Sequence, residues 1–156
     1  MGTLGRISWD ELGMSVASAV ARRSPCERAT VGAALLNKNR IVSTGYNGPA
    51  SGHPADTETG CSNWCARSAG EVKASTAYGF SCPSIHAEAN ALLYASRRDT
   101  EGATLYVTHA PCADCAKLIS NSGVARVVIG EEPPQHRPDP VPYLQDCGIA
   151  VSVLVL

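Results

Sequence analysis

Aromatic side chains and surplus positive charge are both scarce in this sequence. Aromatic residues make up 5% of its 156 residues, and 13 lysines and arginines face 14 aspartates and glutamates, for a net charge of −1. A protein that binds a nucleic-acid strand uses a basic groove and stacking aromatic rings. The composition therefore disfavours a polynucleotide partner, whereas the single phosphate of a small molecule remains compatible with it.

Long apolar runs are lacking as well. No stretch reaches the roughly 18 apolar residues of a membrane-spanning helix, and the opening residues MGTLGRISWDELG lack the apolar centre of a signal peptide. We therefore expect a cytoplasmic protein with no membrane partner. A length of 156 residues is that of one ordinary domain, so residues 1–156 are expected to fold as a single domain. With 44% apolar and 17% charged residues, a disordered chain is not expected.

Cysteine, in contrast, is plentiful, with seven residues in the chain. In a reducing compartment, cysteines more often bind metal or act chemically than form disulfides. Several of them fall in residues 53–82, a cysteine-rich insertion loop without helix or strand periodicity. A loop this long in a small domain is usually functional or held together by a metal.

Hydrophobic periodicity and turn residues predict an α/β layer architecture, with a central sheet flanked by helices. Ser8 and Glu11 form a capping-box pattern ahead of the first helix. Gly123 suits the end of a later one. The predicted helices are 9–23, 86–97, 112–121 and a short one ending near residue 148; the predicted strands are 30–36, 40–46, 103–108, 125–129 and 149–156, with a hairpin turn at 37–39.

Two short segments carry the residues suited to chemistry. His86 and Glu88 open one predicted helix, and Cys112 and Cys115 open the next. The free N–H groups and positive dipole end of a helix start favour thiolates there. His86 and Glu88 can serve one pocket only if His86 lies at the start of its helix.

One imidazole and two thiolates give a metal three protein ligands. Structural zinc normally has four, whereas catalytic zinc keeps one position for water. Glu88 is then free to accept and return a proton as general base and general acid. The sequence thus predicts a catalytic Zn²⁺ on His86, Cys112 and Cys115, with Glu88 as the catalytic residue.

The order H-x-E…P-C-x-x-C is the signature of the zinc deaminases. Taken alone, a C-x-x-C pair could be redox-active or part of a structural zinc site, and a single histidine at a helix start could be a cap. The H-x-E and P-C-x-x-C segments together, in this order and each at a helix start, favour the deaminase interpretation.

Further segments resemble the deoxycytidylate (dCMP) deaminases of the cytidine deaminase-like superfamily. The similarity covers roughly residues 10–130 and includes G-Y-N-G at 45–48 and P-C-x-x-C-A-K at 111–117. It implies a three-layer α/β/α sandwich with a central mixed five-stranded sheet. It also implies hydrolysis of dCMP to dUMP with release of ammonia, which would supply dUMP for thymidylate synthesis.

The resemblance also assigns substrate contacts. It implies that Asn47 bonds the sugar 3′-hydroxyl and that backbone groups of Ala87 and Ala110 read the cytosine edge. Arg28 is the candidate for binding the phosphate, and Ser24 and Asn90 are further candidates for residues that surround the phosphate. Asn47 could instead be only a turn residue, and Arg28 only a solvated arginine.

Some members of the family carry a second, structural zinc held by a cysteine before the first strand and by the loop. The resemblance implies such a site here from four of five residues: Cys26, His53, Cys61, Cys65 and Cys82. Isolated buried thiols are the alternative. By the same resemblance the protein would be a homo-oligomer, a hexamer, with dCTP and dTTP as candidate effectors.

Alternatives stay open at this point. The substrate could be a 5-substituted dCMP, dCTP or a free cytosine nucleoside. A polynucleotide-editing deaminase would need a basic, aromatic groove, and a zinc-stabilised binding module without activity would have no use for Glu88.

Overall fold

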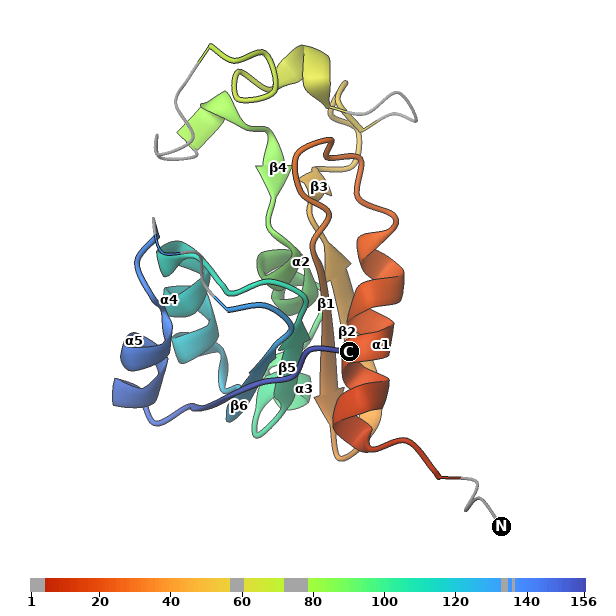
Figure 1. The fold of residues 1–156 in the computed structure, drawn as a ribbon, viewed down its shortest axis with the longest axis vertical. Coiled ribbons are helices and arrows are strands. Elements are labelled where there is room, and N and C mark those ends of the chain that lie inside the picture. Colours follow the sequence, from red (N-terminus) through yellow and green to blue (C-terminus); the bar gives the residue numbers. More distant parts are fainter. Residues whose placement is uncertain (1–4, 57–60, 72–78, 133–134, 136) are drawn as a thin grey trace.

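A five-stranded sheet in the order β2-β1-β5-β6-β7 forms the centre of the molecule. Figure 1 shows the computed structural model, which describes residues 5–56, 61–71, 79–132, 135 and 137–156. β1 pairs antiparallel with β2 and β5, whereas β5, β6 and β7 run parallel, so the sheet is mixed, as predicted. The strands are β1 (Gly32–Asn37), β2 (Arg40–Tyr46), β5 (Thr104–Val107), β6 (Arg126–Ile129) and β7 (Ala150–Val153).

Helices cover both faces of this sheet and complete three layers. On one face, α1 packs through Met14 and Ala17 onto Ala34 and Tyr106. On the other face, α2, α4 and α5 pack on the alternate residues of the same strands, including Leu35 and Leu105. Figure 1 shows α1 on one side of the sheet and α4 and α5 on the other. The helices are α1 (Trp9–Ala21), α2 (Ala87–Leu93), α3 (Arg97–Thr100), α4 (Ala113–Ser122) and α5 (Val141–Asp146).

Local signals in the sequence set several of these boundaries. Ser8 and Glu11 form the predicted capping box, in which the Ser8 hydroxyl accepts from the Glu11 N–H at 3.1 Å. The β1–β2 hairpin turns through Lys38 and Asn39, whose φ angles of 47° and 62° are those of a two-residue turn. Gly123 ends α4 with a left-handed φ of 97°, as expected of a C-cap.

The predicted helix 86–97 is in fact two helices. α2 ends at Leu93, and Ser96 begins α3 with a capping box of its own, formed with Asp99. The apolar periodicity runs across both helices, which is why the sequence suggested one. The capping side chain of Ser96 decides the break, because it binds the free N–H groups of a new first turn.

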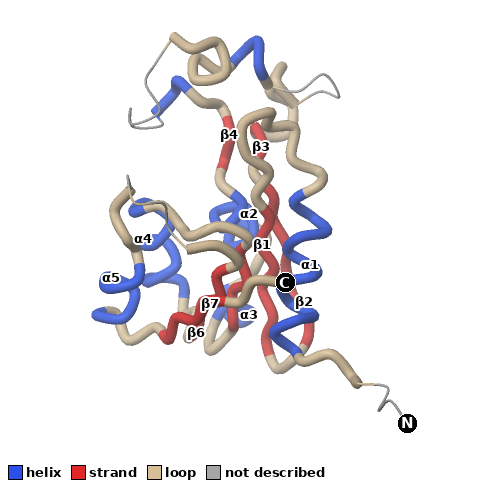
Figure 2. The backbone as a smooth tube through the Cα atoms, in the orientation of Figure 1, coloured by secondary structure: helices blue, strands red, loops and turns tan. Residues whose placement is uncertain are grey.

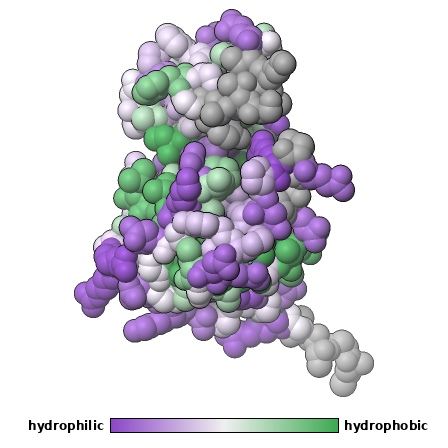
Figure 3. Space-filling view, turned by 90° about the vertical axis from the view of Figure 1, so that its left-hand side faces the viewer, coloured by the Kyte–Doolittle hydropathy of each residue, from purple (hydrophilic) through white to green (hydrophobic). Residues whose placement is uncertain are grey.

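A small lobe rises from the body where the sequence predicted only loop. Its neck is a two-stranded sheet of β3 (Gly48–Pro49) and β4 (Ser84–Ile85). Two short 3₁₀ helices, Ser62–Trp64 and Gly79–Ser81, lie beyond it. Ala55, Cys61 and Cys65 form a miniature core against which Cys82 packs. Figure 2 shows the lobe as mostly loop on the β3–β4 neck, and Figure 3 shows it as a bulge with polar and apolar residues interspersed.

Candidate metal centre and its pocket

The candidate metal ligands lie at the starts of two neighbouring helices. His86 is the N-cap of α2, with an extended backbone (φ −68°, ψ 154°), and Cys112 is the N-cap of α4. The Cys112 Sγ accepts a hydrogen bond from the Cys115 N–H at 3.5 Å. This is the arrangement that the sequence required, because only at the helix start can His86 and Glu88 face one pocket.

The three ligand atoms converge. The Nδ1 of His86 lies 3.4 Å from the Sγ of Cys112 and 3.5 Å from the Sγ of Cys115. Tetrahedral zinc, with Zn–S near 2.3 Å and Zn–N near 2.0–2.1 Å, places its sulfur and nitrogen ligands about 3.6 Å apart. Among the described residues, these three form the one group of histidine, cysteine or acidic ligands whose atoms all lie within 4.8 Å of one another. The donor set and its spacing therefore fit a three-ligand zinc.

Hydrogen bonds among the three candidate ligands shift the pKa values of the two thiols in opposite directions. The hydrogen bond from the Cys115 thiol, and then those with His86, hold the pKa of Cys112 far below its usual range. The same contact, with burial, raises the pKa of Cys115. The hydrogen bond with Cys112 raises the pKa of His86. A divalent cation would bind both thiols in their deprotonated forms.

Glu88 lies beside the ligands in the first turn of α2, with 4% of its surface exposed. Burial raises its pKa above that of an ordinary glutamate. It also interacts with the thiol of Cys115. A buried carboxyl group with a raised pKa is suited to both accepting and donating a proton near neutral pH.

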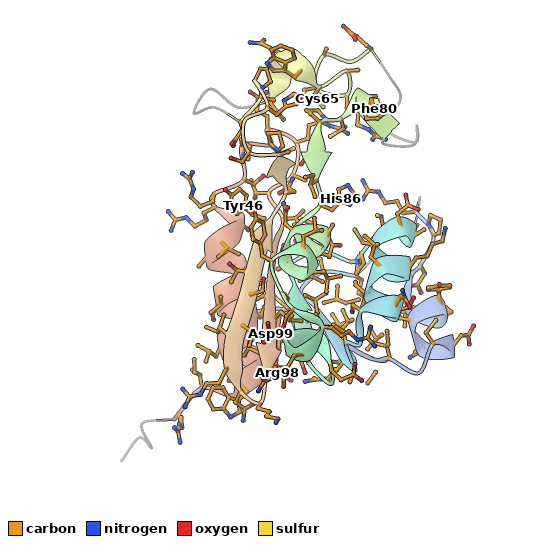
Figure 4. All side chains as sticks on the ribbon, turned by 180° about the vertical axis from the view of Figure 1, so that it is seen from behind. Tyr46, Cys65, Phe80, His86, Arg98 and Asp99 are labelled. Atoms are coloured by element: carbon orange, nitrogen blue, oxygen red, sulfur yellow. The ribbon has the colours of Figure 1, made fainter. Side chains whose placement is uncertain are left out.

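A cavity of about 310 Å³ opens over this centre, within the size range of small-molecule sites. His86, Glu88 and Cys112 contribute to its lining from the body of the protein. Cys65 and Cys82 contribute from the lobe. Figure 4 shows His86 beneath the lobe that carries Cys65 and Phe80. The cavity therefore lies between the candidate metal centre and the lobe.

Asn47 lines the cavity, but its side chain also holds the chain that leads into β1. Its Oδ1 accepts from the Val31 N–H at 2.7 Å and its Nδ2 donates to the Ala29 carbonyl at 2.8 Å. Each amide atom can form one more hydrogen bond. Its predicted contact with a sugar hydroxyl is therefore compatible with this framework role.

The other predicted substrate residues divide into two groups. Ala87, Ala110 and Arg28 line the cavity. Ser24 and Asn90 are not part of the cavity lining. Their side chains form hydrogen bonds with the backbone: the Ser24 hydroxyl donates to the Asn47 carbonyl at 2.7 Å, and the Asn90 amide donates to the Tyr46 carbonyl at 2.8 Å. These two residues position the segment that carries Asn47.

Four of the five candidate second-site ligands lie near one another: Cys61, Cys65 and Cys82 in the lobe, and Cys26 in the segment before β1. Cys65 and Cys82 share a side-chain hydrogen bond. Burial, and then the charges of Cys26, Cys65 and Cys82, raise the pKa of Cys61 to about 11. His53 is engaged elsewhere, since its Nδ1 accepts from the Ala55 N–H at 3.0 Å and its ring meets Trp64 edge-on.

Sequence reasoning missed several residues that line the cavity. Arg67 from the lobe is 7% exposed, although it carries a full charge. Its position in an aperiodic loop gave no sign of burial. His109 lies 3.5 Å from Glu131 at the rim, where Glu132 and Arg137 also line the opening.

Within the described residues, no helix combines the length and the apolar character that a membrane crossing requires.

A model of the cytidine and deoxycytidylate deaminase zinc-binding region matches residues 7–131. The chain is 45% identical over 132 residues to the deoxycytidylate deaminase of Mycobacterium phage D29, a match that covers 83% of this chain and 99% of that protein. It is 37% identical over 123 residues to the human deoxycytidylate deaminase, covering 78% and 64% of the two chains.

A solved structure shares the fold. The dCMP deaminase of the cyanophage S-TIM5, determined in complex with dCMP and dUMP, superposes with a TM-score of 0.70 and 28% sequence identity. The match covers 96% of this chain and 99% of that one. The predicted cytidine deaminase-like α/β/α architecture is thereby confirmed.

Proposed function

We propose that this chain, which belongs to the cytidine and deoxycytidylate deaminase family, hydrolyses dCMP to dUMP and ammonia. The observation that carries this proposal is a three-ligand metal centre beside the buried carboxyl group of Glu88. A structural site would have a fourth protein ligand and no need of a buried acid. The dUMP produced would supply thymidylate synthesis.

Zinc is the metal that we propose for this ligand set. His86 would bind it through Nδ1, and Cys112 and Cys115 would bind it as thiolates. When bound, zinc would supply Lewis-acid activation of water at neutral pH. Two thiolates offset the charge of the divalent ion, and the helix starts stabilise them.

Glu88 is the group that we propose to move the protons. As water adds to C4 of the cytosine ring, the carboxylate takes a proton from that water. It then delivers a proton to the exocyclic amine, so that the C4–N bond breaks and ammonia leaves. Burial keeps the Glu88 proton within the site, because the surroundings of the side chain exclude bulk water.

The walls of the cavity would orient the nucleotide. We assign the cytosine edge to backbone groups of Ala87 and Ala110, and the sugar 3′-hydroxyl to the remaining hydrogen-bonding capacity of Asn47. Arg28 lies at the lining with its side chain exposed, where it can meet a phosphate.

A turnover panel tests the substrate. The zinc-loaded protein is assayed with dCMP, deoxycytidine, dCTP and 5-substituted dCMPs under identical conditions. The proposal expects the highest kcat/KM for dCMP. A higher value for another phosphorylated or 5-substituted nucleotide would transfer the assignment to that nucleotide, and a preference for deoxycytidine would refute a nucleotide substrate.

A second zinc is a further proposal, on Cys26, Cys61, Cys65 and Cys82. Two observations support this site. Three of these thiols pack together in the miniature core. Burial, and then the charges of the other three cysteines, raise the pKa of Cys61. No three of them bring their sulfurs within 4.8 Å of one another, so the thiols would close inward around the ion. The role would be structural, because four cysteines would leave no open position.

Metal analysis of the purified protein distinguishes one zinc ion per chain from two. The purified wild-type protein should contain about two zinc ions per chain, and Cys61→Ser about one while still deaminating dCMP. About one zinc per chain in the wild type, unchanged in Cys61→Ser, would refute the second site and leave the catalytic one standing.

We also propose self-association, on the basis of the family resemblance. Leu93 and Tyr94 at the end of α2 are 71% and 79% exposed, and Ile41 on β2 is 50% exposed. Light scattering during size-exclusion chromatography should show an assembly, a hexamer by resemblance. The same experiment with dCTP or dTTP tests these nucleotides as effectors, and a monomer at all concentrations would refute the assembly.

A further inference from the structure

We infer that His109, at the rim of the cavity, binds the phosphate of the substrate through its Nε2–H group, and that the Glu131 carboxylate faces this donor until the phosphate displaces it. The inference rests on the proposed function, since it concerns the phosphate of the nucleotide proposed above. No motif of the sequence assigned either residue a role.

His109 and Glu131 leave the central sheet side by side. Val107 and Ile129 are the last residues of β5 and β6, and they are partners in the parallel register of these strands. His109 and Glu131 each follow two positions later, at the same edge of the sheet. Both residues line the cavity, and their side chains are 39% and 67% exposed. A ligand that enters the cavity can therefore reach the contact between them.

The neighbours of the His109 ring determine which nitrogen carries a proton. Its Nδ1 lies 2.9 Å from the Thr108 hydroxyl oxygen, and its Nε2 lies 3.5 Å from the Oε2 of Glu131. A lone pair on Nε2 would be repelled by the carboxylate, so the neutral ring carries its proton on Nε2 and accepts from Thr108 at Nδ1. The protonated ring donates from both nitrogens. Nε2 is thus a donor that faces an anionic oxygen in either charge state.

The contact between His109 and Glu131 is one that a phosphate can displace. Its length of 3.5 Å exceeds that of a charge-assisted hydrogen bond, which is about 2.7–2.9 Å. Both side chains meet solvent, and exposed ion pairs contribute little to stability. A phosphate offers three oxygens and up to two negative charges, so it competes well with a single carboxylate.

The position of His109 relative to the proposed sugar contact favours the phosphate as its ligand. The Asn47 side chain accepts from the Val31 N–H at 2.7 Å, and the next N–H along the chain, that of Gly32, donates to the Thr108 hydroxyl at 3.1 Å. Asn47 and His109 are therefore joined through consecutive backbone groups at the start of β1. The phosphate is the anionic group carried by the sugar that we assign to Asn47.

The other charged groups at the rim supply a matched control. Arg28 and Arg137 line the cavity with exposed side chains and would attract any phosphate that enters. Glu132 carries the same charge as Glu131 on the same lining. Among the described residues, Glu131 is the carboxylate that pairs with His109. Replacing Glu132 therefore removes a negative charge without freeing the proposed donor.

Calorimetry with dUMP and deoxyuridine, which differ only in the phosphate, tests the donor. The zinc-loaded wild type should bind dUMP more tightly than deoxyuridine. His109→Leu should weaken dUMP about 10-fold, near the lower end for a hydrogen bond to a charged group, and leave deoxyuridine unchanged. His109→Gln, which retains an N–H near the position of Nε2, should recover part of the loss. Zinc content and thermal stability are measured on each variant.

The displacement of Glu131 is tested with the same two ligands. Glu131→Gln should tighten dUMP about 2- to 5-fold without affecting deoxyuridine, because it removes the anion that faces the donor. Glu132→Gln should tighten dUMP less, since it changes only the overall charge of the rim. In a His109→Leu background, Glu131→Gln should gain less than in the wild type, because the two effects are coupled through one donor.

The outcomes separate this inference from the proposed function. An equal loss for dUMP and deoxyuridine in His109→Leu, or no loss for either, would overturn the phosphate contact, as would a wild type without preference for dUMP. Equal gains in Glu131→Gln and Glu132→Gln would overturn the displacement, and this comparison needs no variant of His109. A wild type that binds dUMP through His109 but does not deaminate dCMP would refute the proposed function and leave the inference intact.

Discussion

The Nδ1 of His86 lies 3.4 Å from the Sγ of Cys112, although 26 positions of sequence separate the two residues. Each is the N-cap of its helix, and the two helices lie side by side on one face of the sheet. The contact joins two segments that the sequence shows only as separate motifs. The metal centre therefore depends on the packing of α2 and α4 as much as on the ligands themselves.

Replacing Glu88 distinguishes its role in proton transfer from a role in metal binding. Glu88→Gln should retain the catalytic zinc and lose turnover by roughly 10²- to 10⁴-fold, the usual contribution of a general acid–base group. Zinc analysis and steady-state kinetics on the same preparation measure both quantities. Glu101→Gln, which removes an exposed glutamate at the end of α3, is the matched control and should keep both. Full activity in Glu88→Gln would disprove the proton-transfer role.

Removing one thiol should remove the catalytic metal. Cys112→Ser is expected to lose about one zinc per chain and nearly all activity, because a hydroxyl group is a poor zinc ligand. Cys147→Ser is the control, since Cys147 is exposed and lies after α5. If Cys112→Ser kept its full zinc content, the ligand assignment would be wrong.

The packing of α2 against β2 can be tested at Gly45. A β-carbon there would lie 2.2 Å from the Ala87 carbonyl oxygen and 2.5 Å from the Ala91 nitrogen, so the helix would have to move. Gly45→Ala should therefore destabilise the protein by about 1–3 kcal/mol and weaken zinc binding, because α2 carries His86. Thr44→Ala, on the exposed side of the same strand, should do neither. Chemical unfolding and competition with a zinc chelator give the two values.

An ion pair between Asp10 and Arg126 ties α1 to the sheet, with the closest atoms 2.7 Å apart. The hydroxyl group of Tyr106 also donates to Asp10, at 2.8 Å. The hydrogen bonds from Arg126 hold the pKa of Asp10 below its ordinary value of 3.8. Both partners are about one-third exposed, so we expect Asp10→Asn to cost about 1 kcal/mol at neutral pH.

The pH dependence of this cost follows from the lowered pKa. The contribution of ionised Asp10 to the free energy of unfolding is complete above the ordinary carboxyl pKa, and it is lost as the pH falls through the pKa of Asp10 in the folded state. Urea unfolding should therefore show a constant difference between wild type and Asp10→Asn from about pH 5 to 8, and a shrinking one below about pH 4. Asp146→Asn, which removes an exposed aspartate of α5, should show no such pattern. A difference that grows in acid would contradict the sign.

Local rules explain why so much of the fold could be predicted from sequence. Capping residues, turn chemistry and strand alternation act within a few positions, and they placed the Ser8 cap, the hairpin turn at Lys38 and the end of α4 correctly. The convergence of the candidate zinc ligands was predictable for the same reason, since their helix-start positions are readable from the flanking residues.

Long-range packing explains what the sequence did not show. The two-residue strands β3 and β4 exist only because Gly48 pairs with Ile85, and neither has a strand pattern of its own. The burial of Arg67 likewise depends on how the lobe folds over the metal centre. The hydrogen bonds from Ser24 and Asn90 to backbone carbonyls also depend on the packed fold. The predicted role of these two residues near the substrate stays a prediction.

Product analysis of dCMP incubated with the zinc-loaded wild-type protein measures the proposed reaction itself. dUMP and ammonia should form in equal amounts, chelation of the metal should stop the reaction, and Glu88→Gln should form neither product at a comparable rate. Unchanged dCMP after incubation with the zinc-loaded wild type would contradict the assignment of this chain as a dCMP deaminase.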